Sequence, residues 1–202
     1  MDIKDTHPMT AWERMQAGLV YNDFDSDLFQ RRVAAKKIFN AYNRTTDEDT
    51  AERKQLLEKL FRHTGERIHI EPDFKCEFGK NITIGNDVYI NFGCIILDCA
   101  DVTIGNNVLI GPNFGIYAVN HGLDPDERIA GACMGKPVHI CDKVWIGGDV
   151  KIMAGVTIGK GSVIGAGSVV TKDIPPYVIA AGNPCRVIRK ITDADKTGFT
   201  AE

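Results

Sequence analysis

The sequence predicts a mainly β protein, in which short strands stack as a β-solenoid behind a small helical N-terminal module. First, aliphatic residues recur every six positions from Ile70 onward, whereas apolar residues before residue 65 follow helical spacing. A six-residue period is too long for a helical turn and too regular for hairpins, so each hexad is expected to form one strand and one turn. Second, the six-residue spacing is interrupted once, which predicts a loop that protrudes from the solenoid.

The helical module covers residues 1–65. Thr10 and Glu13 fit a capping box, which starts a short helix that reaches about Ala17. Two longer helices follow, and their apolar residues are Leu28, Val33, Ile38, Phe39 and Tyr42 for the second and Leu56, Leu57, Leu60 and Phe61 for the third. Because three short helices bury little apolar surface alone, we expect the module to dock on something larger.

Composition sets outer limits on function. The chain has 202 residues and a net charge of −3, so whole-chain charge does not favour nucleic acid or an anionic membrane as partner. Residues 1–10 are polar where a secretory leader would be apolar, and no apolar run has the length of a membrane span. The six cysteines include no C-x-x-C pair, which favours free core thiols, no metal site and a cytoplasmic location.

The solenoid is predicted over residues 66–190, with a C-terminal tail at 191–202. The aliphatic positions of the clearest array are Ile140, Ile146, Ile152, Ile158, Ile164 and Val170, and those of an earlier array are Ile84, Ile90, Ile96, Ile104, Ile110 and Ile116. Small or β-branched residues follow four positions after each member of the clearest array. Gly147, Gly159 and Gly165 come directly after aliphatic positions, where we expect turns with positive φ.

The break in the frame lies between Ile116 and Ile140, where one in-frame residue is Arg128. An unpaired Arg cannot sit in an aliphatic column. Residues 120–137 are therefore expected to leave the solenoid as a protruding loop, and long loops in compact domains are often functional.

These features resemble the maltose/galactoside O-acetyltransferases. The resemblance rests on the hexads, on Asn-His-Gly-Leu-Asp-Pro at 120–125, on Gly-Lys-Pro at 135–137, and on Val-Trp-Ile-Gly-Gly at 144–148. It extends to the C-terminal segments 169–175 and 181–188 and to the front at 15–28 and 71–82, so it covers nearly the whole chain. It implies a left-handed parallel β-helix of triangular section, with three hexads per coil and active sites in clefts between the subunits of a homotrimer.

The reaction that this resemblance implies is acetyl transfer from acetyl-CoA to a sugar hydroxyl, with no metal required. His121, in the protruding loop, matches the catalytic base, and a neutral imidazole can accept the hydroxyl proton because its reference pKa is ~6.5. The resemblance implies direct attack within a ternary complex. Cys133 lies close to His121 in the sequence, so a Cys–His nucleophile is the mechanistic alternative.

Several positions match residues that contact the acceptor in this family: Asp23, Glu77, Tyr89, Asn91 and Cys133. Asn22 is an alternative to Asp23. The motif Cys-Asp-Tyr-Gly of relatives reads Cys-Glu-Phe-Gly here, so the carboxylate of Glu77 is carried on a longer side chain. Cys133 stands where maltose-type relatives often carry Glu, and the loss of that carboxylate is expected to change which sugar binds.

The coenzyme A contacts implied by the resemblance are Gly111, Gly148, Ala166, Thr171, Lys172, Arg186 and Arg189. Small residues leave room for the pantetheine arm, and the three basic side chains can bind phosphates through charge-assisted hydrogen bonds. Gly148 replaces the Ser of some relatives, so only its backbone N–H can stabilise the oxyanion.

Other functions stay open at this point. The chain could acetylate the amine of an aminosugar or an antibiotic, or it could be a non-catalytic hexapeptide scaffold. A zinc enzyme of β-helical type is disfavoured, because only His121 among the five histidines matches a functional motif.

Overall fold

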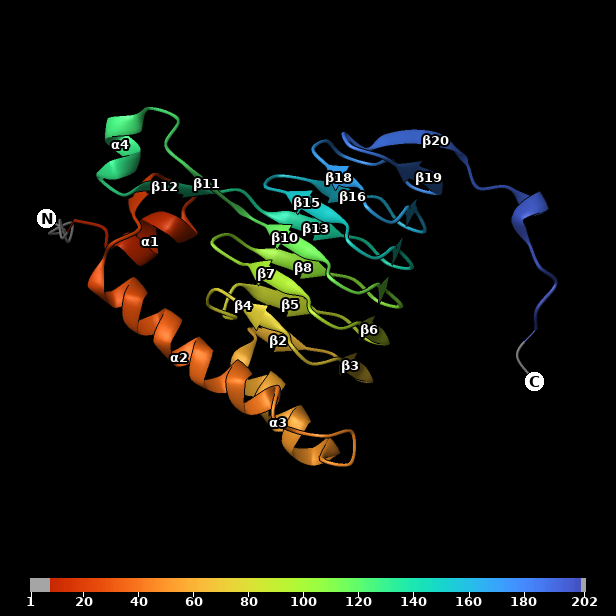
Figure 1. Ribbon diagram of the computed structural model, residues 1–202, viewed down its shortest axis with the longest axis horizontal. Coiled ribbons are helices and arrows are strands. Elements are labelled where there is room, and N and C mark those ends of the chain that lie inside the picture. The colour runs from red at the N-terminus through yellow and green to blue at the C-terminus, as the bar shows by residue number, and fades with distance from the viewer. Residues whose placement is uncertain (1–7, 201–202) are drawn as a thin grey trace, which may run out of the picture.

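The structure is a computed structural model that describes residues 8–200. The residues before Pro8, part of the segment predicted to lack a leader, fall outside that range. A left-handed β-helix fills most of the molecule, with a helical module at one end and a protruding hairpin at the side (Figure 1). The predicted fold class is therefore confirmed. None of the helices in residues 8–200 has the length and apolar character needed to span a membrane.

The three predicted helices are present. The capping box of Thr10 and Glu13 starts α1 (Ala11–Gln16), with the Thr10 Oγ1 atom accepting the Glu13 N–H at 3.2 Å. The Asp25 carboxylate accepts the N–H groups of Asp27 and Leu28 at the start of α2 (Ser26–Tyr42). Helix α3 (Thr50–Leu60) follows. Local capping chemistry therefore marks where α1 and α2 begin.

The coils form three parallel sheets, one for each face of the triangular section. The first face contains β2 (His63–Thr64), β5 (Ile82–Ile84), β8 (Val102–Ile104), β13 (Val138–Ile140) and β16 (Thr157–Ile158). The second contains β3 (Ile68–Ile70), β6 (Val88–Ile90), β9 (Leu109–Ile110), β14 (Trp145–Ile146), β17 (Val163–Ile164) and β19 (Val178–Ala181). The third contains β4 (Lys75–Cys76), β7 (Ile95–Leu97), β10 (Gly115–Tyr117), β15 (Lys151–Met153) and β18 (Val169–Val170).

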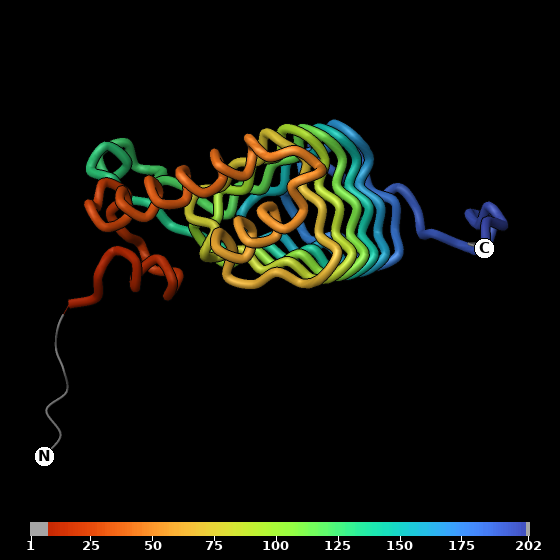
Figure 2. The backbone as a smooth tube through the Cα atoms, turned by 90° about the horizontal axis from the view of Figure 1, so that it is seen from below, coloured from red at the N-terminus to blue at the C-terminus, as the bar shows by residue number. Residues whose placement is uncertain are grey.

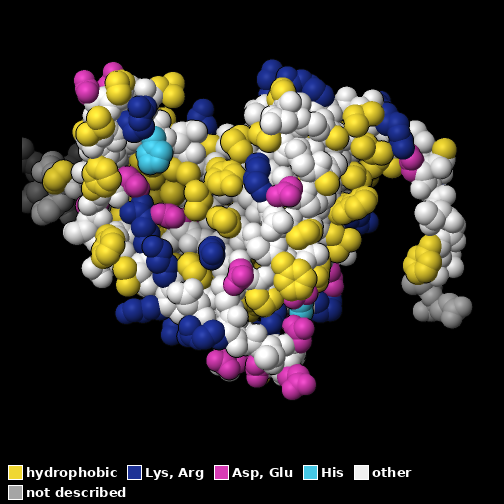
Figure 3. Space-filling view, in the orientation of Figure 1, with side chains coloured by type: hydrophobic (Ala, Val, Ile, Leu, Met, Phe, Trp, Pro, Cys, Tyr) yellow, Lys and Arg dark blue, Asp and Glu magenta, His cyan; other side chains and the backbone are white. Residues whose placement is uncertain are grey.

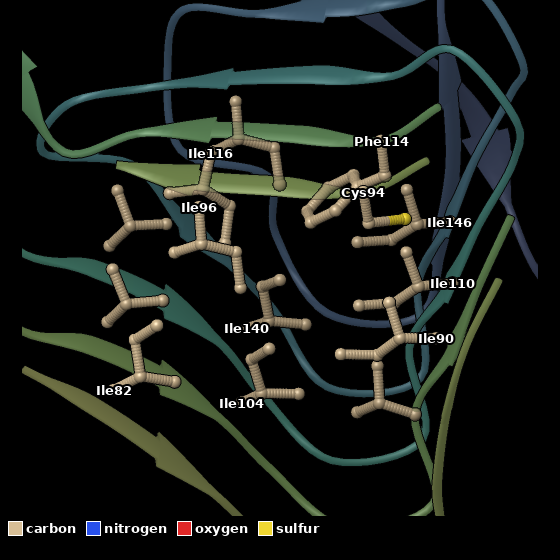
Figure 4. Close-up of a cluster of buried hydrophobic side chains, with 14 of the residues drawn as sticks. Ile82, Ile90, Cys94, Ile96, Ile104, Ile110, Phe114, Ile116, Ile140 and Ile146 are labelled. Atoms are coloured by element: carbon tan, nitrogen blue, oxygen red, sulfur yellow. The ribbon is translucent and has the colours of Figure 1, made fainter. Parts of the chain in front are cut away.

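The aliphatic positions of the hexads form the core, as three stacks that meet inside the triangle. Ile104 pairs with Ile140 on the first face, Ile110 with Ile146 on the second, and Ile116 with Ile152 on the third. Consecutive hexads thus occupy consecutive faces, and the periodic residues point inward from three sides (Figure 4). Each of these six side chains is at most 1% exposed.

The glycines that follow the aliphatic positions serve a different purpose from the one expected. Gly147, Gly159 and Gly165 are absent from the positive-φ positions, which include Asn107 and Asn113. A Cβ on Gly147 would lie 2.6 Å from the backbone N of Ala166 in the next coil. These glycines are therefore needed because the coils approach closely at the corners.

The predicted excursion is an ordered hairpin. Strand β11 (Val119–His121) leads to α4 (Pro125–Ile129) and returns through β12 (Ala132–Gly135), with Arg128 exposed on α4. Strand β12 pairs antiparallel with β11 on one side and with β1 (Tyr21–Asn22) of the helical module on the other. In the resulting three-stranded sheet, β12 is the central strand, β11 is one edge strand, and β1 of the module is the other.

Both ends of the solenoid are covered. Helices α2 and α3 lie across the first coil (Figures 1 and 2), and Phe39, Tyr42 and Leu60 join the same buried cluster as Ile70 and Phe74. At the other end β20 (Arg186–Lys190) pairs antiparallel with β19, and a short 3₁₀ helix, η1 (Asp193–Asp195), follows in the tail. Strand β2 already pairs in parallel with β5, so the first coil begins within the segment 1–65 that the sequence assigns to the module.

Candidate active site

The hairpin holds His121 at an exposed position. His121 lies opposite Cys133 in the β11–β12 pair, and Cys133 lies opposite Tyr21 in the β12–β1 pair, so the three side chains form one row across the sheet. The Gly122 N–H donates to the Ala132 carbonyl at 2.9 Å and extends this pairing beyond His121. An imidazole in this place is open to a substrate while its backbone is fixed by the ladder.

Two of the predicted acceptor residues are joined by a residue that the sequence reasoning missed. The Arg32 guanidinium pairs with Asp23 through one nitrogen and with Glu77 through Nε. A third nitrogen donates to the Asp23 carbonyl at 3.0 Å. These two carboxylates raise the pKa of Arg32, although its burial acts in the opposite direction and is the larger single influence. Arg32 therefore connects the module, which carries Asp23, to the first coils, which carry Glu77.

Arg32 could have been found from the sequence. Buried positions of α2 include Leu28, Ala35 and Phe39, and Arg32 falls on the same stripe, one turn after Leu28. A charged residue on the buried stripe of an amphipathic helix requires a partner. That signal is present in the sequence but does not identify which carboxylates provide the pairing.

A buried carboxylate supports the turn that carries Glu77. The Asp98 carboxylate accepts the backbone N–H groups of Glu77 at 3.0 Å and Phe78 at 2.8 Å through Oδ1, and that of Asn81 at 3.2 Å through Oδ2. Burial raises the pKa of Asp98 to about 7, against the lowering effect of these donors. Sequence reasoning missed this residue as well. It fixes the position from which Glu77 reaches Arg32.

Cys133 does not face an open site in the single chain. Its side chain is 1% exposed and belongs to a cluster with Tyr21, Phe78 and Cys99. Burial raises the pKa of the Cys133 thiol. The thiol is thus neutral and enclosed, which is typical of a structural cysteine. The prediction of core thiols also fits Cys76, Cys94 and Cys185, which are buried.

Tyr89 and Asn91 lie on another part of the molecule. Tyr89 is on β6 of the second face, and Asn91 follows at the corner, where its Oδ1 accepts the Phe92 N–H at 2.8 Å. The hairpin instead leaves the coil after β10 of the third face. No hydrogen bond within residues 8–200 links Tyr89 or Asn91 to the hairpin. One chain therefore brings Asp23 and Glu77 together through Arg32 but leaves Tyr89 and Asn91 apart from His121.

The predicted pantetheine residues share the corner between the second and third faces. A Cβ on Gly111 would lie 2.6 Å from the Gly148 backbone N, which shows how closely these coils stack. The backbone N–H groups of Gly147 and Asp149 donate to carbonyls of adjacent coils. In the part of the chain that the structure describes, the Gly148 N–H has no such partner. Ala166 stacks on the same corner, one coil further on.

The predicted phosphate-binding residues lie near the last coils. Thr171 and Lys172 follow β18 and are exposed. Arg186 and Arg189 are on β20, and Arg189 donates to both carboxylate oxygens of Asp195, at 2.8 and 2.6 Å. The tail thus holds one of the three predicted phosphate ligands in an ion pair.

Charged side chains gather on the surface around the hairpin. Figure 3 shows acidic, basic and histidine side chains close together where the hairpin meets the helical module. The one group of His, Cys, Asp and Glu side chains with metal-ligand spacing in residues 8–200 joins Asp47, in the loop between α2 and α3, to His69 and Glu71 of the first coil. It does not include His121.

Comparisons with known proteins agree with this architecture. Residues 14–65 match the maltose acetyltransferase hexapeptide capping motif, and residues 137–172 match the bacterial transferase hexapeptide model of six repeats. The galactoside O-acetyltransferase of Escherichia coli K12 is 44% identical over 189 residues, which cover 94% of this chain and 92% of the relative.

Solved structures give the same result. A maltose O-acetyltransferase from Clostridium difficile 630 superposes with a TM-score of 0.89 at 44% identity, covering 93% of this chain and all of that one. A hexapeptide-repeat acetyltransferase from Vibrio cholerae O1 biovar eltor, solved with acetyl-CoA, gives a TM-score of 0.84 at 41% identity over 92% of this chain and all of its own. By its motifs, its fold and its relatives, the chain belongs to the maltose/galactoside O-acetyltransferase family.

Proposed function

We propose that the protein transfers the acetyl group of acetyl-CoA to a hydroxyl group of a sugar, with His121 as the general base. The observation that carries this proposal is the position of His121, exposed on the single ordered excursion of the coils in residues 8–200, in a chain of this family. Beside it, the Asp23–Arg32–Glu77 group offers carboxylate oxygens to sugar hydroxyls.

The proposed reaction assigns a role to each of these groups. His121 takes the proton of the sugar hydroxyl as its oxygen attacks the thioester carbonyl carbon. The Gly148 N–H donates to the oxyanion that forms on the carbonyl oxygen. The intermediate then collapses, the carbon–sulfur bond breaks, and the coenzyme A thiolate receives the proton from the His121 imidazolium. The acetyl ester and free coenzyme A are the products.

We favour direct attack over an acetyl-cysteine intermediate. An acyl-enzyme would need a reactive thiolate, but Cys133 is enclosed and its pKa is raised by burial. Mixing the enzyme with acetyl-CoA alone should leave Cys133 unmodified in mass spectra. Stoichiometric acetylation of Cys133 at the rate of turnover would refute direct attack.

We further propose that the active form is a homotrimer whose sites lie between subunits. Tyr89, Leu109 and Trp145 are cross-strand neighbours on the second face, and the latter two side chains are 53% and 56% exposed. A neighbouring subunit would cover this apolar row and could bring Tyr89 and Asn91 to the His121 of another chain. Sedimentation equilibrium of the wild type and of Trp145→Arg tests this arrangement, because a monomeric wild type with full activity would contradict it.

The activity is tested by measuring coenzyme A release with a panel of sugars, aminosugars and simple alcohols. We expect turnover with neutral sugars and a product esterified at oxygen. Turnover confined to aminosugars, with an amide product, would instead identify an N-acetyltransferase. No turnover with any member of the panel would favour a scaffold.

A further inference from the structure

A hydrogen bond to Glu71 and a ring stack with His69 hold the side chain of Tyr89 on the first coils. The Tyr89 hydroxyl donates to the Glu71 Oε1 atom at 3.0 Å, and the His69 Nε2 atom lies 3.2 Å from the same oxygen. The rings of His69 and Tyr89 stack with centroids 5.6 Å apart and planes at 11°. These side chains come from the paired strands β3 and β6, in which His69 lies opposite Tyr89.

Glu71 is itself held in place. Its backbone N–H donates to the Ile90 carbonyl at 2.8 Å, which continues the ladder between β3 and β6. Its side chain is only 15% exposed, so the carboxylate is shielded from water, and among the described residues its hydrogen-bond donor is the Tyr89 hydroxyl. Burial, and then the hydrogen bond to Glu71, raise the pKa of Tyr89. The phenol therefore keeps its proton and donates it to the carboxylate.

A phenol has one proton to donate. Because that proton is engaged in the hydrogen bond to Glu71, the Tyr89 oxygen can offer only its lone pairs to a substrate. A sugar hydroxyl can satisfy it by donating a hydrogen bond. A fluorine atom at the same position accepts but cannot donate, so the phenol oxygen would then lose its substrate partner.

We propose that Glu71 is a positioning residue that makes Tyr89 an obligate hydrogen-bond acceptor, so that the site selects acceptors with a hydrogen-bond donor at the position facing Tyr89. The inference rests on the proposed function, in which Tyr89 lines the acceptor site. It assigns to Glu71 a role in specificity, without contact between Glu71 and the reacting atoms.

The test uses the best sugar of the acceptor panel and its monodeoxyfluoro analogues. For the wild type, we expect kcat/KM to fall by about 5- to 20-fold for the analogue fluorinated at the position facing Tyr89, the usual effect of one unsatisfied hydrogen-bonding group. Analogues fluorinated at other positions calibrate the electronic effect of fluorine. Glu71→Ala should remove this discrimination, since the phenol is then free to rotate and donate to fluorine.

Three further variants separate positioning from structural damage. Glu71→Gln should preserve the discrimination, because its amide oxygen can accept the same hydrogen bond from Tyr89. Tyr89→Phe should abolish the discrimination and raise the KM for the parent sugar more than it lowers kcat. Glu66→Ala is the matched control, since Glu66 is an exposed carboxylate on the same coil, bound to Arg67 at 3.3 Å, and it should behave as wild type.

Discrimination that persists in Glu71→Ala, or in Tyr89→Phe, would overturn the inference. If that occurs while His121→Ala loses turnover, only the role of Glu71 fails and the proposed function stands. If the wild type acetylates no sugar, both fail together.

Discussion

The coils and the hairpin differ in what stabilises them. In the coils, each periodic side chain stacks on its equivalents one coil away, as Ile116 and Val170 do on either side of Ile152. The hairpin has no such equivalents and is held by pairing with β1, a strand of two residues from the distant N-terminal module. The repeat supplies rigidity, whereas the candidate base His121 lies on the segment that the repeat does not determine.

The largest expected effect is on the hairpin. His121→Ala should lower kcat by about 10²–10⁴-fold, as expected for the loss of a positioned general base, while the KM for acetyl-CoA changes little. The fold should be retained, because His121 is exposed and outside the stacked core. Steady-state kinetics together with thermal unfolding check both statements. A folded variant with near-normal kcat would show that His121 is not the general base.

For stability, in contrast, we expect a substitution in the coils to matter more than one in the hairpin. Ile152→Ala on the third face should lower the free energy of unfolding by about 2–5 kcal/mol, because the side chain is fully buried between equivalent residues. Ile129→Ala on α4 should change it by less than about 0.5 kcal/mol, since Ile129 is 75% exposed. Urea unfolding of the two variants at the same protein concentration measures the difference. Equal losses of stability would show that the hairpin is packed as firmly as the coils.

The third prediction separates binding from rate. Lys172→Ala and Arg186→Ala should each raise the KM for acetyl-CoA by about 5- to 10-fold with a smaller effect on kcat, because phosphate contacts are nearly equal in the ground and transition states. Arg189→Ala should have a smaller effect, since Arg189 is already paired with Asp195. Asp195→Asn should lower the KM by freeing that guanidinium. Unchanged KM values in all four variants would place the cofactor elsewhere.

The smallest expected effect concerns the joint between coils and module. The folded pKa of Asp98 is about 7, above its unfolded value of ~3.9. The folded state therefore retains this proton when the unfolded state has lost it, and the resulting stability is present at low pH and lost as pH rises through 7. The melting temperature of the wild type should thus exceed that of Asp98→Asn by a few degrees more at pH 5 than at pH 8. Parallel curves would contradict this titration.

The sequence predicts the coils well because their physics is local and repeated. Positions such as Ile140 and Ile146 show the period directly, and the failure of the frame at Arg128 locates the excursion. The pairing of Tyr21 with Cys133 could not be predicted, since a strand of two residues has no periodicity and its partner lies far along the chain. For the site, the motif around His121 identifies the candidate base.

The remainder of the site depends on tertiary contacts. The bridge from Arg32 to Asp23 and Glu77 joins segments whose closeness only the folded chain reveals. Gly147 does not have the expected positive φ. A close approach between coils and a positive φ both favour glycine in a sequence. Residue type alone does not separate these two causes.

The covered ends of the solenoid have a consequence for the behaviour of the protein in a crowded solution. A stack of parallel coils exposes unpaired backbone groups at its first and last turns, and each end could template another molecule. Here α2 and α3 occupy one end, and the reversed strand β20 occupies the other. These elements hinder end-to-end growth into a fibre and leave the sides of the prism as the larger surface open to another molecule.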